Sequence, residues 1–284
     1  MTEEQSLGKG PDDENFPVAS VLIRRDLRPL IRSFYFFARA ADDIADSTEL
    51  SAAEKLARLN ACERALNGDV HTGDQCLKAA VLAAKLSETA VGVRHAAQLV
   101  AAFRQDAVQE RYRSWDDLVE YCRYSANPVG RYLLELHGEC EGAAVQSDAL
   151  CTALQVLNHL QDCGADYRDL NRVYLPLDWM NAAETGVEDL TMDAASPGLR
   201  RVLNQVLDKT EKLIEQARPM GRIVRDRRLA AEAAVICELA RRLARRLRRQ
   251  DPLAMRVSLS KFDFCCALAA GLIQALMPRV RGSV

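Results

Sequence analysis

The chain has 284 residues, 49% of them hydrophobic, with only 14 glycines and 9 prolines. This size and composition favour an all-α domain with a sizeable core. The formal net charge of −2 argues against general nucleic-acid binding. Nine scattered cysteines without a C-x-x-C pair indicate reduced thiols in a cytoplasmic protein. We see no signal peptide and no apolar run of the roughly 18 to 20 residues that a membrane span needs.

The chain begins with a polar segment without periodicity, residues 1–13, which we expect to be disordered. The ordered domain is expected to cover residues 14–284. Asn15 and Phe16 open it, and Pro17 suits the first turn of a helix that Asn15 would cap.

Residues 33–47 read SFYFFARAADDIADS, which predicts a helix buried over most of its circumference. At about 100° per residue, one face of this helix carries Tyr35, Arg39, Asp42 and Asp46, with Asp43 at its edge. Carboxylates four residues apart repel each other, and a buried one is costly unless it is paired or bound to a metal. We therefore expect a cationic partner at this face.

Amphipathic helices are predicted over 51–66, 75–85 and 94–111. Ser114 has the pattern of an N-cap for a helix that runs to Tyr124. Asn127-Pro128 should break or kink that helix. Small side chains at Ser125, Ala126 and Gly130 would allow a long chain to pass close to the backbone there.

A second polar stripe lies in residues 154–166, LQVLNHLQDCGAD, which are otherwise apolar and helical in pattern. Spacings of three, four and four place on one face Gln155, Asn158, Asp162 and Asp166. His159 neighbours this stripe, and we expect it to point away from it. One aspartate pair alone is more often a solvated helix face. Two pairs in apolar sequence predict a site for Mg²⁺, which prefers oxygen ligands and substrate phosphate oxygens.

The C-terminal part is predicted to contain helices over 199–218, 222–249 and 261–277, after a non-helical segment at 171–176 and a polar connection at 189–198. The run RRLARRLRRQ at 241–250 is usually a solvated or partner-facing surface. A basic face could also bind an anionic membrane, at about 1 kcal/mol per basic residue. Both interpretations of Arg241–Arg249 stay open, including a peripheral position on the inner face of the membrane.

Three segments resemble the squalene and phytoene synthase family: DDIAD at 42–46, YCRYSANPVG at 121–130, and QDCGAD at 161–166 continued by YRDLNRVYLP. ENFPVAS at 14–20 and SANPVGR at 125–131 are most similar to its hydroxysqualene synthase branch. The resemblance implies a single-domain isoprenoid synthase fold, with helices around a central apolar cavity. Gln161 departs from the family, where many members carry Arg, which puts in doubt a first reaction step needing an extra cation.

The resemblance also implies roles for individual residues. Two or three Mg²⁺ ions would be held by Asp42, Asp46, Asn158, Asp162 and Asp166. Catalytic roles fall to Tyr121, Arg39 and Tyr35. The prenyl diphosphate would be contacted by Asn15, Phe16, Arg39, Asp43, Ser125, Val129, Gly130, Gln155, Asn158, Arg172 and Tyr174. Arg172 and Tyr174 would belong to a flap over the diphosphate.

The implied reaction is conversion of presqualene diphosphate and water to hydroxysqualene and diphosphate, with no NADPH. One alternative is head-to-head condensation of two prenyl diphosphates to presqualene diphosphate, squalene or phytoene. An alternative of another class is a non-catalytic helical scaffold at a membrane, which predicts interrupted aspartate motifs.

Overall fold

The computed structural model describes residues 22–69, 76–139 and 141–276, so the predictions for 1–13, Asn15 and Phe16 lie outside the described residues. The described part is helical, with no strand and one isolated backbone bridge between Arg111 and Val173. The predicted all-α class is confirmed. The elements are α1 (Arg28–Asp46), α2 (Ala52–Leu66), α3 (Leu77–Leu86), α4 (Arg94–Asp106), α5 (Trp115–Ser125), α6 (Asn127–Leu136), η2 (Glu141–Ala143), α7 (Ala144–Leu170), α8 (Leu177–Ala182), η3 (Val187–Thr191), α9 (Pro197–Ala217), α10 (Met220–Ile223), α11 (Arg227–Arg249) and α12 (Lys261–Leu276).

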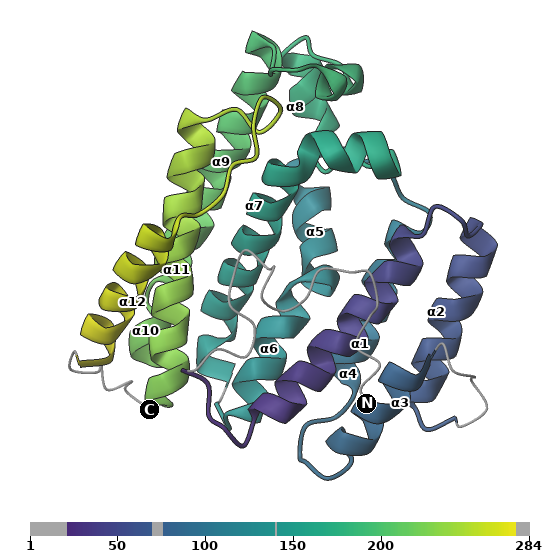
Figure 1. The fold of residues 1–284 in the computed structure, drawn as a ribbon, viewed down its shortest axis with the longest axis vertical. Helices are drawn as coiled ribbons and strands as arrows, with labels where there is room; N and C mark the ends of the chain where they lie inside the picture. Colours follow the sequence, from purple (N-terminus) through teal and green to yellow (C-terminus); the bar gives the residue numbers. More distant parts are fainter. Residues whose placement is uncertain (1–21, 70–75, 140, 277–284) are drawn as a thin grey trace.

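The long helix α7 lies near the middle of the molecule (Figure 1). It packs against α5 and α6 on one side and against α9 and α11 on the other. Helix α1 packs against α2, α3 and α4, and α12 lies at the opposite edge against α11. The two aspartate stretches thus belong to helices α1 and α7.

Local sequence accounts for several helix ends. The Ser51 side chain accepts from the Glu54 backbone N–H while the Glu54 carboxylate accepts from Ser51, which is a complete capping box at the start of α2. The predicted cap at Ser114 is confirmed, because its hydroxyl accepts from the Asp117 backbone. The predicted break is confirmed as well: α5 ends at Ser125, and Pro128 stands in the first turn of α6.

Two predicted helices end differently from the expectation. Helix α4 ends at Asp106 rather than 111, because the backbone that follows bonds to another segment. The N–H of Val173 donates to the Glu110 carbonyl, and that of Leu177 donates to the Tyr112 carbonyl. The expected helix over 222–249 is divided into α10 and α11, since Asp226 caps α11 by accepting from Arg228 and Leu229.

Other boundaries are longer than expected. Helix α1 begins at Arg28 and α7 at Ala144, so each aspartate stretch is the C-terminal part of a longer helix. The short helix α8 was not predicted. Within the described residues, none of the helices is both long and apolar enough to cross a membrane.

Candidate active site

An apolar cavity of about 350 Å³ lies between α1, α6, α7 and α11. Among its lining residues are six of the predicted site residues: Tyr35, Ser125, Val129, Gly130, Gln155 and Asn158. Gly130 allows the close approach of α6 to α7, since a Cβ there would lie 2.2 Å from Ser147 Oγ and 2.7 Å from Cys151 Sγ. The expected small-residue passage beside the backbone is therefore present, with Ala126 also in its wall.

The first aspartate pair lies at the C-terminal end of α1, together with Arg39. The Arg39 guanidinium contacts Asp42 at 3.0 Å and Asp43 at 2.9 Å. Burial and repulsion from Asp46 raise the pKa of Asp42 to about 8, against the opposing effect of Arg39. About a third of the Asp42 side chain (32%) is accessible to solvent, and the carboxylates of Asp46, Asp106 and Asp43 nearby disfavour its charged form. The first pair therefore needs more positive charge than Arg39 alone provides.

Arg172, which follows α7, is the second cation at the first aspartate pair. Its side chain is buried and donates to the Asp46 carboxylate, to the Ala45 carbonyl and to the Asp106 carbonyl. Helix α7 ends as predicted before this segment, with Asn171 in the left-handed region at φ 52°. Arg172 thus ties the segment after α7 to the ends of α1 and α4.

Asp106 accepts hydrogen bonds from two tyrosines beneath this end of the site. Tyr121 Oη lies 2.8 Å and Tyr174 Oη 3.4 Å from its carboxylate oxygens. Burial raises the pKa of Asp106 to about 6 and those of both tyrosines well above 10, so the tyrosines are neutral donors. The hydroxyl of Tyr121 therefore faces Asp106. Neither Tyr121 nor Tyr174 is among the residues that line the apolar cavity.

The second stripe, on α7, is half-buried and follows the predicted spacing. His159 was expected to point away from it, and this expectation is wrong. Its ring lies 3.1 Å from Gln155 Nε2, 3.9 Å from an Asp166 oxygen, and stacks on Tyr174 with 3.5 Å between ring centroids. His159 therefore connects the second stripe to Tyr174, whose hydroxyl contacts Asp106. Arg172 contacts both the Asp106 carbonyl and Asp46, which completes the connection to the first aspartate pair.

Asp106 and His159 are polar residues of this site to which the sequence analysis assigned no catalytic, binding or metal role. Asp106 lies at the end of an ordinary amphipathic helix, and its only signal was its position before Arg111-Tyr112. For His159, the i+4 spacing from Gln155 was the available signal. Gln161, the residue that departs from the family, donates to the Val257 carbonyl at 2.6 Å, so it fastens α7 to the connection before α12.

The oxygen atoms of the two polar stripes suit Mg²⁺ in chemical type, although they do not converge on one point. Among residues 22–69, 76–139 and 141–276, no three His, Cys, Asp or Glu side chains converge as a group that could hold an ion. The available groups are carboxylate and amide oxygens, which suit a hard cation. The raised pKa of Asp42, caused in part by Asp46, marks a place where a cation would relieve repulsion between carboxylates.

Comparison with known proteins agrees with this arrangement. Residues 11–263 match the family model for squalene/phytoene synthase. The chain is 44% identical to a hydroxysqualene synthase of Rhodopseudomonas palustris, over 99% of this chain and 96% of that protein. It is 44% identical to a hydroxysqualene synthase of Zymomonas mobilis subsp. mobilis, over 90% and 86% of the two chains.

Solved structures show the same fold. A squalene synthase of Alicyclobacillus acidocaldarius superposes with a TM-score of 0.70 and 31% identity, covering 82% of this chain and 87% of that one. A dehydrosqualene synthase has a TM-score of 0.73 at 22% identity, covering 90% and 89%, which supports the fold alone. The chain belongs to the squalene/phytoene synthase family.

Proposed function

We propose that this protein converts presqualene diphosphate and water to hydroxysqualene and diphosphate. The observation that carries the proposal is the apolar cavity whose wall includes Asn158 and Gln155, on the same helix face as Asp162 and Asp166. A prenyl chain in this cavity would place a diphosphate at the aspartates. Similarity to two proteins named hydroxysqualene synthase supports this branch of the family.

Carboxylate and amide side chains would hold the metal. Asp42, Asp46, Asn158, Asp162 and Asp166 are the ligands we propose for two or three Mg²⁺ ions, and the bound ions supply positive charge for the departing diphosphate. Arg39, now paired with Asp42 and Asp43, would turn to the diphosphate once Asp42 binds the metal. Asp43 would then position Arg39 for this contact.

The protein's own part in the reaction is to hold the chain and to exclude water. Tyr35, Ser125, Val129 and Gly130 form cavity wall against which the prenyl chain would lie, and one water would be admitted to capture the carbocation. Tyr121, through Asp106, fixes Tyr174 and the segment that carries Arg172 against the diphosphate end. Water capture needs no hydride donor, so no NADPH is expected in the reaction.

The test is product analysis with Mg²⁺ and without NADPH, giving the protein presqualene diphosphate and farnesyl diphosphate separately. Hydroxysqualene from presqualene diphosphate alone supports the proposal. Presqualene diphosphate formed from farnesyl diphosphate would replace it with the condensing activity. In Asp42→Asn and Asp162→Asn, turnover should fall by orders of magnitude while the fold persists. Asp169→Asn, an exposed position on α7, is the matched control, and a scaffold protein would show no turnover in any of them.

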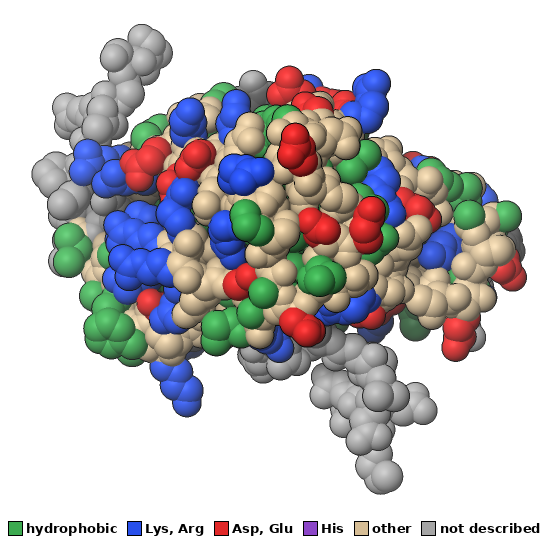
Figure 2. Space-filling view, turned by 90° about the horizontal axis from the view of Figure 1, so that it is seen from above, with side chains coloured by type: hydrophobic (Ala, Val, Ile, Leu, Met, Phe, Trp, Pro, Cys, Tyr) green, Lys and Arg blue, Asp and Glu red, His purple; other side chains and the backbone are tan. Residues whose placement is uncertain are grey.

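We also propose that the protein is cytoplasmic and works against an anionic membrane. Lys and Arg side chains gather on the side of α11 and α12, next to hydrophobic side chains (Figure 2). Helix α12 exposes three apolar side chains at intervals of four: Phe264 (38%), Leu268 (44%) and Leu272 (52%). Such an apolar stripe beside a basic one suits the interface of a bilayer.

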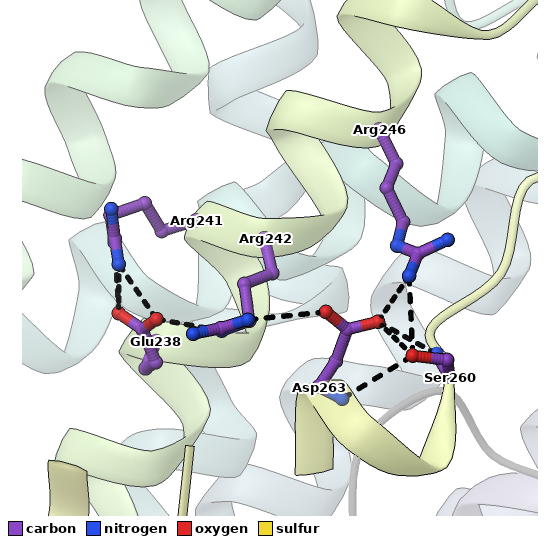
Figure 3. Close-up of polar contacts among 6 residues, drawn as sticks. All are labelled: Glu238, Arg241, Arg242, Arg246, Ser260 and Asp263. Atoms are coloured by element: carbon purple, nitrogen blue, oxygen red, sulfur yellow. Dashed lines mark hydrogen bonds and ion pairs between the residues drawn. The ribbon is translucent and has the colours of Figure 1, made fainter. Parts of the chain in front are cut away.

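Several arginines of Arg241–Arg249 are already paired with acidic side chains, so the others are the candidates for contact with lipid. Arg241 and Arg242 contact Glu238, and Arg242 and Arg246 contact Asp263 (Figure 3). Arg245 and Arg249 are exposed. We expect binding to vesicles with anionic lipid and weaker binding to neutral ones, reduced by Arg245→Glu with Arg249→Glu. Equal binding to both vesicle types would contradict membrane contact through this surface.

A further inference from the structure

The end of the apolar cavity remote from the aspartates contains two polar side chains that the reaction does not use. Ser147, on α7, is 1% exposed, and its Oγ has no hydrogen-bond partner among the described residues. Glu232, on α11, is 4% exposed. Both line the cavity, and the described lining residues on neighbouring segments include the apolar Ile23, Leu150, Met220 and Leu229.

These two residues belong to the same end of the cavity. Ser147 is near the start of α7 and Glu232 near the start of α11. The elements just before them, η2 and α10, contact each other. Ser147 lies 11 residues before Asn158, which corresponds to about 16 Å along the helix. The proposed metal ligands Asp162 and Asp166 follow Asn158 along α7, so they lie still further from Ser147.

We propose that Ser147 and Glu232 form a polar floor that sets the longest prenyl chain the cavity accepts. This rests on the proposed function only in so far as the cavity holds prenyl chains. A chain that ends above the floor leaves the existing interaction of Glu232 undisturbed and leaves room for water at Ser147. A chain longer by one isoprene unit would press methyl groups against a buried carboxylate and a hydroxyl, and neither would gain a hydrogen bond in return.

The experiment measures binding rather than turnover. Full-length protein with Mg²⁺ is titrated with non-hydrolysable C15 and C20 prenyl thiodiphosphates, and the ratio of the two dissociation constants is compared between variants. Glu232→Ala should raise the relative affinity for C20 at least tenfold, and Ser147→Ala a few-fold. Thr210→Val, which removes a buried hydroxyl on α9 outside the cavity wall, should leave the ratio unchanged.

Two further variants separate polarity from bulk. Glu232→Met and Glu232→Gln have similar length, and the proposal requires Met to shift the ratio toward C20 while Gln keeps it within about threefold. An unchanged ratio in Glu232→Ala and Ser147→Ala would overturn the proposal. So would a shift in Glu232→Ala that is absent in Glu232→Met, because the floor would then act by bulk alone. If selectivity shifts but no hydroxysqualene forms from presqualene diphosphate, the proposed function fails and the floor stands.

Discussion

The guanidinium of Arg172 donates to the carboxylate of Asp46, although 126 residues of chain separate them. One partner lies just after the second aspartate helix and the other ends the first, so the pair joins the two halves of the site. Asp46 is also a proposed metal ligand. The ion pair and the proposed metal would therefore share one carboxylate.

Replacing Arg172 with Lys should destabilise the metal-free protein by about 1–3 kcal/mol, because a single ammonium cannot serve three acceptors in the plane that the guanidinium reaches. Urea unfolding gives the magnitude. Since the Lys ammonium would hold the Asp46 carboxylate less firmly, that carboxylate is freer to bind metal, and added Mg²⁺ should stabilise the variant more than the original protein. Arg131→Lys, which alters an exposed ion pair with Asp148, should cost about 1 kcal/mol or less. A variant that gains no more from Mg²⁺ than the original would contradict the shared role of Asp46.

The affinity for Mg²⁺ should rise with pH up to about 8. At pH 7 the Asp42 carboxyl, whose pKa is raised to about 8, still holds a proton that metal binding must release. Release of one proton per ion gives up to about a tenfold gain in affinity per pH unit below that pKa. Calorimetry in buffers of different ionisation enthalpy measures the proton count directly. In Asp42→Asn the slope should disappear; a slope that persists would assign the proton to another group.

The same raised pKa predicts the pH dependence of stability without metal. The folded state binds a proton at Asp42 between pH 4 and 8 that the unfolded chain, with an ordinary pKa of 3.8, has released. This contribution favours folding at low pH and is lost as pH rises through that window. Thermal unfolding in chelator should show it, and saturating Mg²⁺ should remove it. Asp42→Asn is the control, since it cannot titrate.

Gly130→Ala should destabilise the protein by about 1–3 kcal/mol, because the added methyl group would overlap Ser147 Oγ and Cys151 Sγ. It should also weaken substrate binding, since the crossing of α6 and α7 forms cavity wall. Adding Ser147→Ala removes the closest contact and should recover part of the stability. A double-mutant cycle by urea unfolding measures this coupling. Purely additive effects would show that α6 moves aside instead.

Asp263→Ala should loosen α12 from α11. Burial opposes the charge of Asp263, but hydrogen bonds from Ser260 and ion pairs with Arg242 and Arg246 outweigh it and hold the pKa of this carboxyl at about 2. Removal leaves Arg246 without this carboxylate and Arg242 with Glu238 alone, at a cost of about 3 kcal/mol. Hydrogen exchange should report faster opening in α12 than in α9. Equal protection of α12 in both proteins would show that apolar packing alone holds it.

The sequence predicted most helices because their apolar residues recur at helical spacing and their caps are local. Ser114 and the break at Pro128 depend only on neighbouring residues, and both predictions are confirmed. The end of α4 was wrong for the opposite reason: the backbone after Asp106 bonds to residues near 173–177, a pairing that no local pattern encodes.

The candidate site, too, was predictable where it depends on local spacing. Spacing predicted that Gln155 and Asn158 share one helix face, and both lie in the cavity wall together with Tyr35 and Ser125. Asp106 and His159 were given no role in the site, because the hydrogen bond and the ring stacking that they make with Tyr174 follow from the folded structure and from no local pattern. The metal ligands stay a prediction, as do the roles of Asp43 and Tyr121.

The backbone bonds from Val173 and Leu177 to Glu110 and Tyr112 also have a consequence for synthesis. During translation, the segment after α4 has no partner until residue 177 has left the ribosome. Arg172 likewise reaches Asp46 and Asp106 only then. The acidic end of α1 therefore lacks its Arg172 partner until more than a hundred further residues have been synthesised, so this end of the site cannot assemble before then.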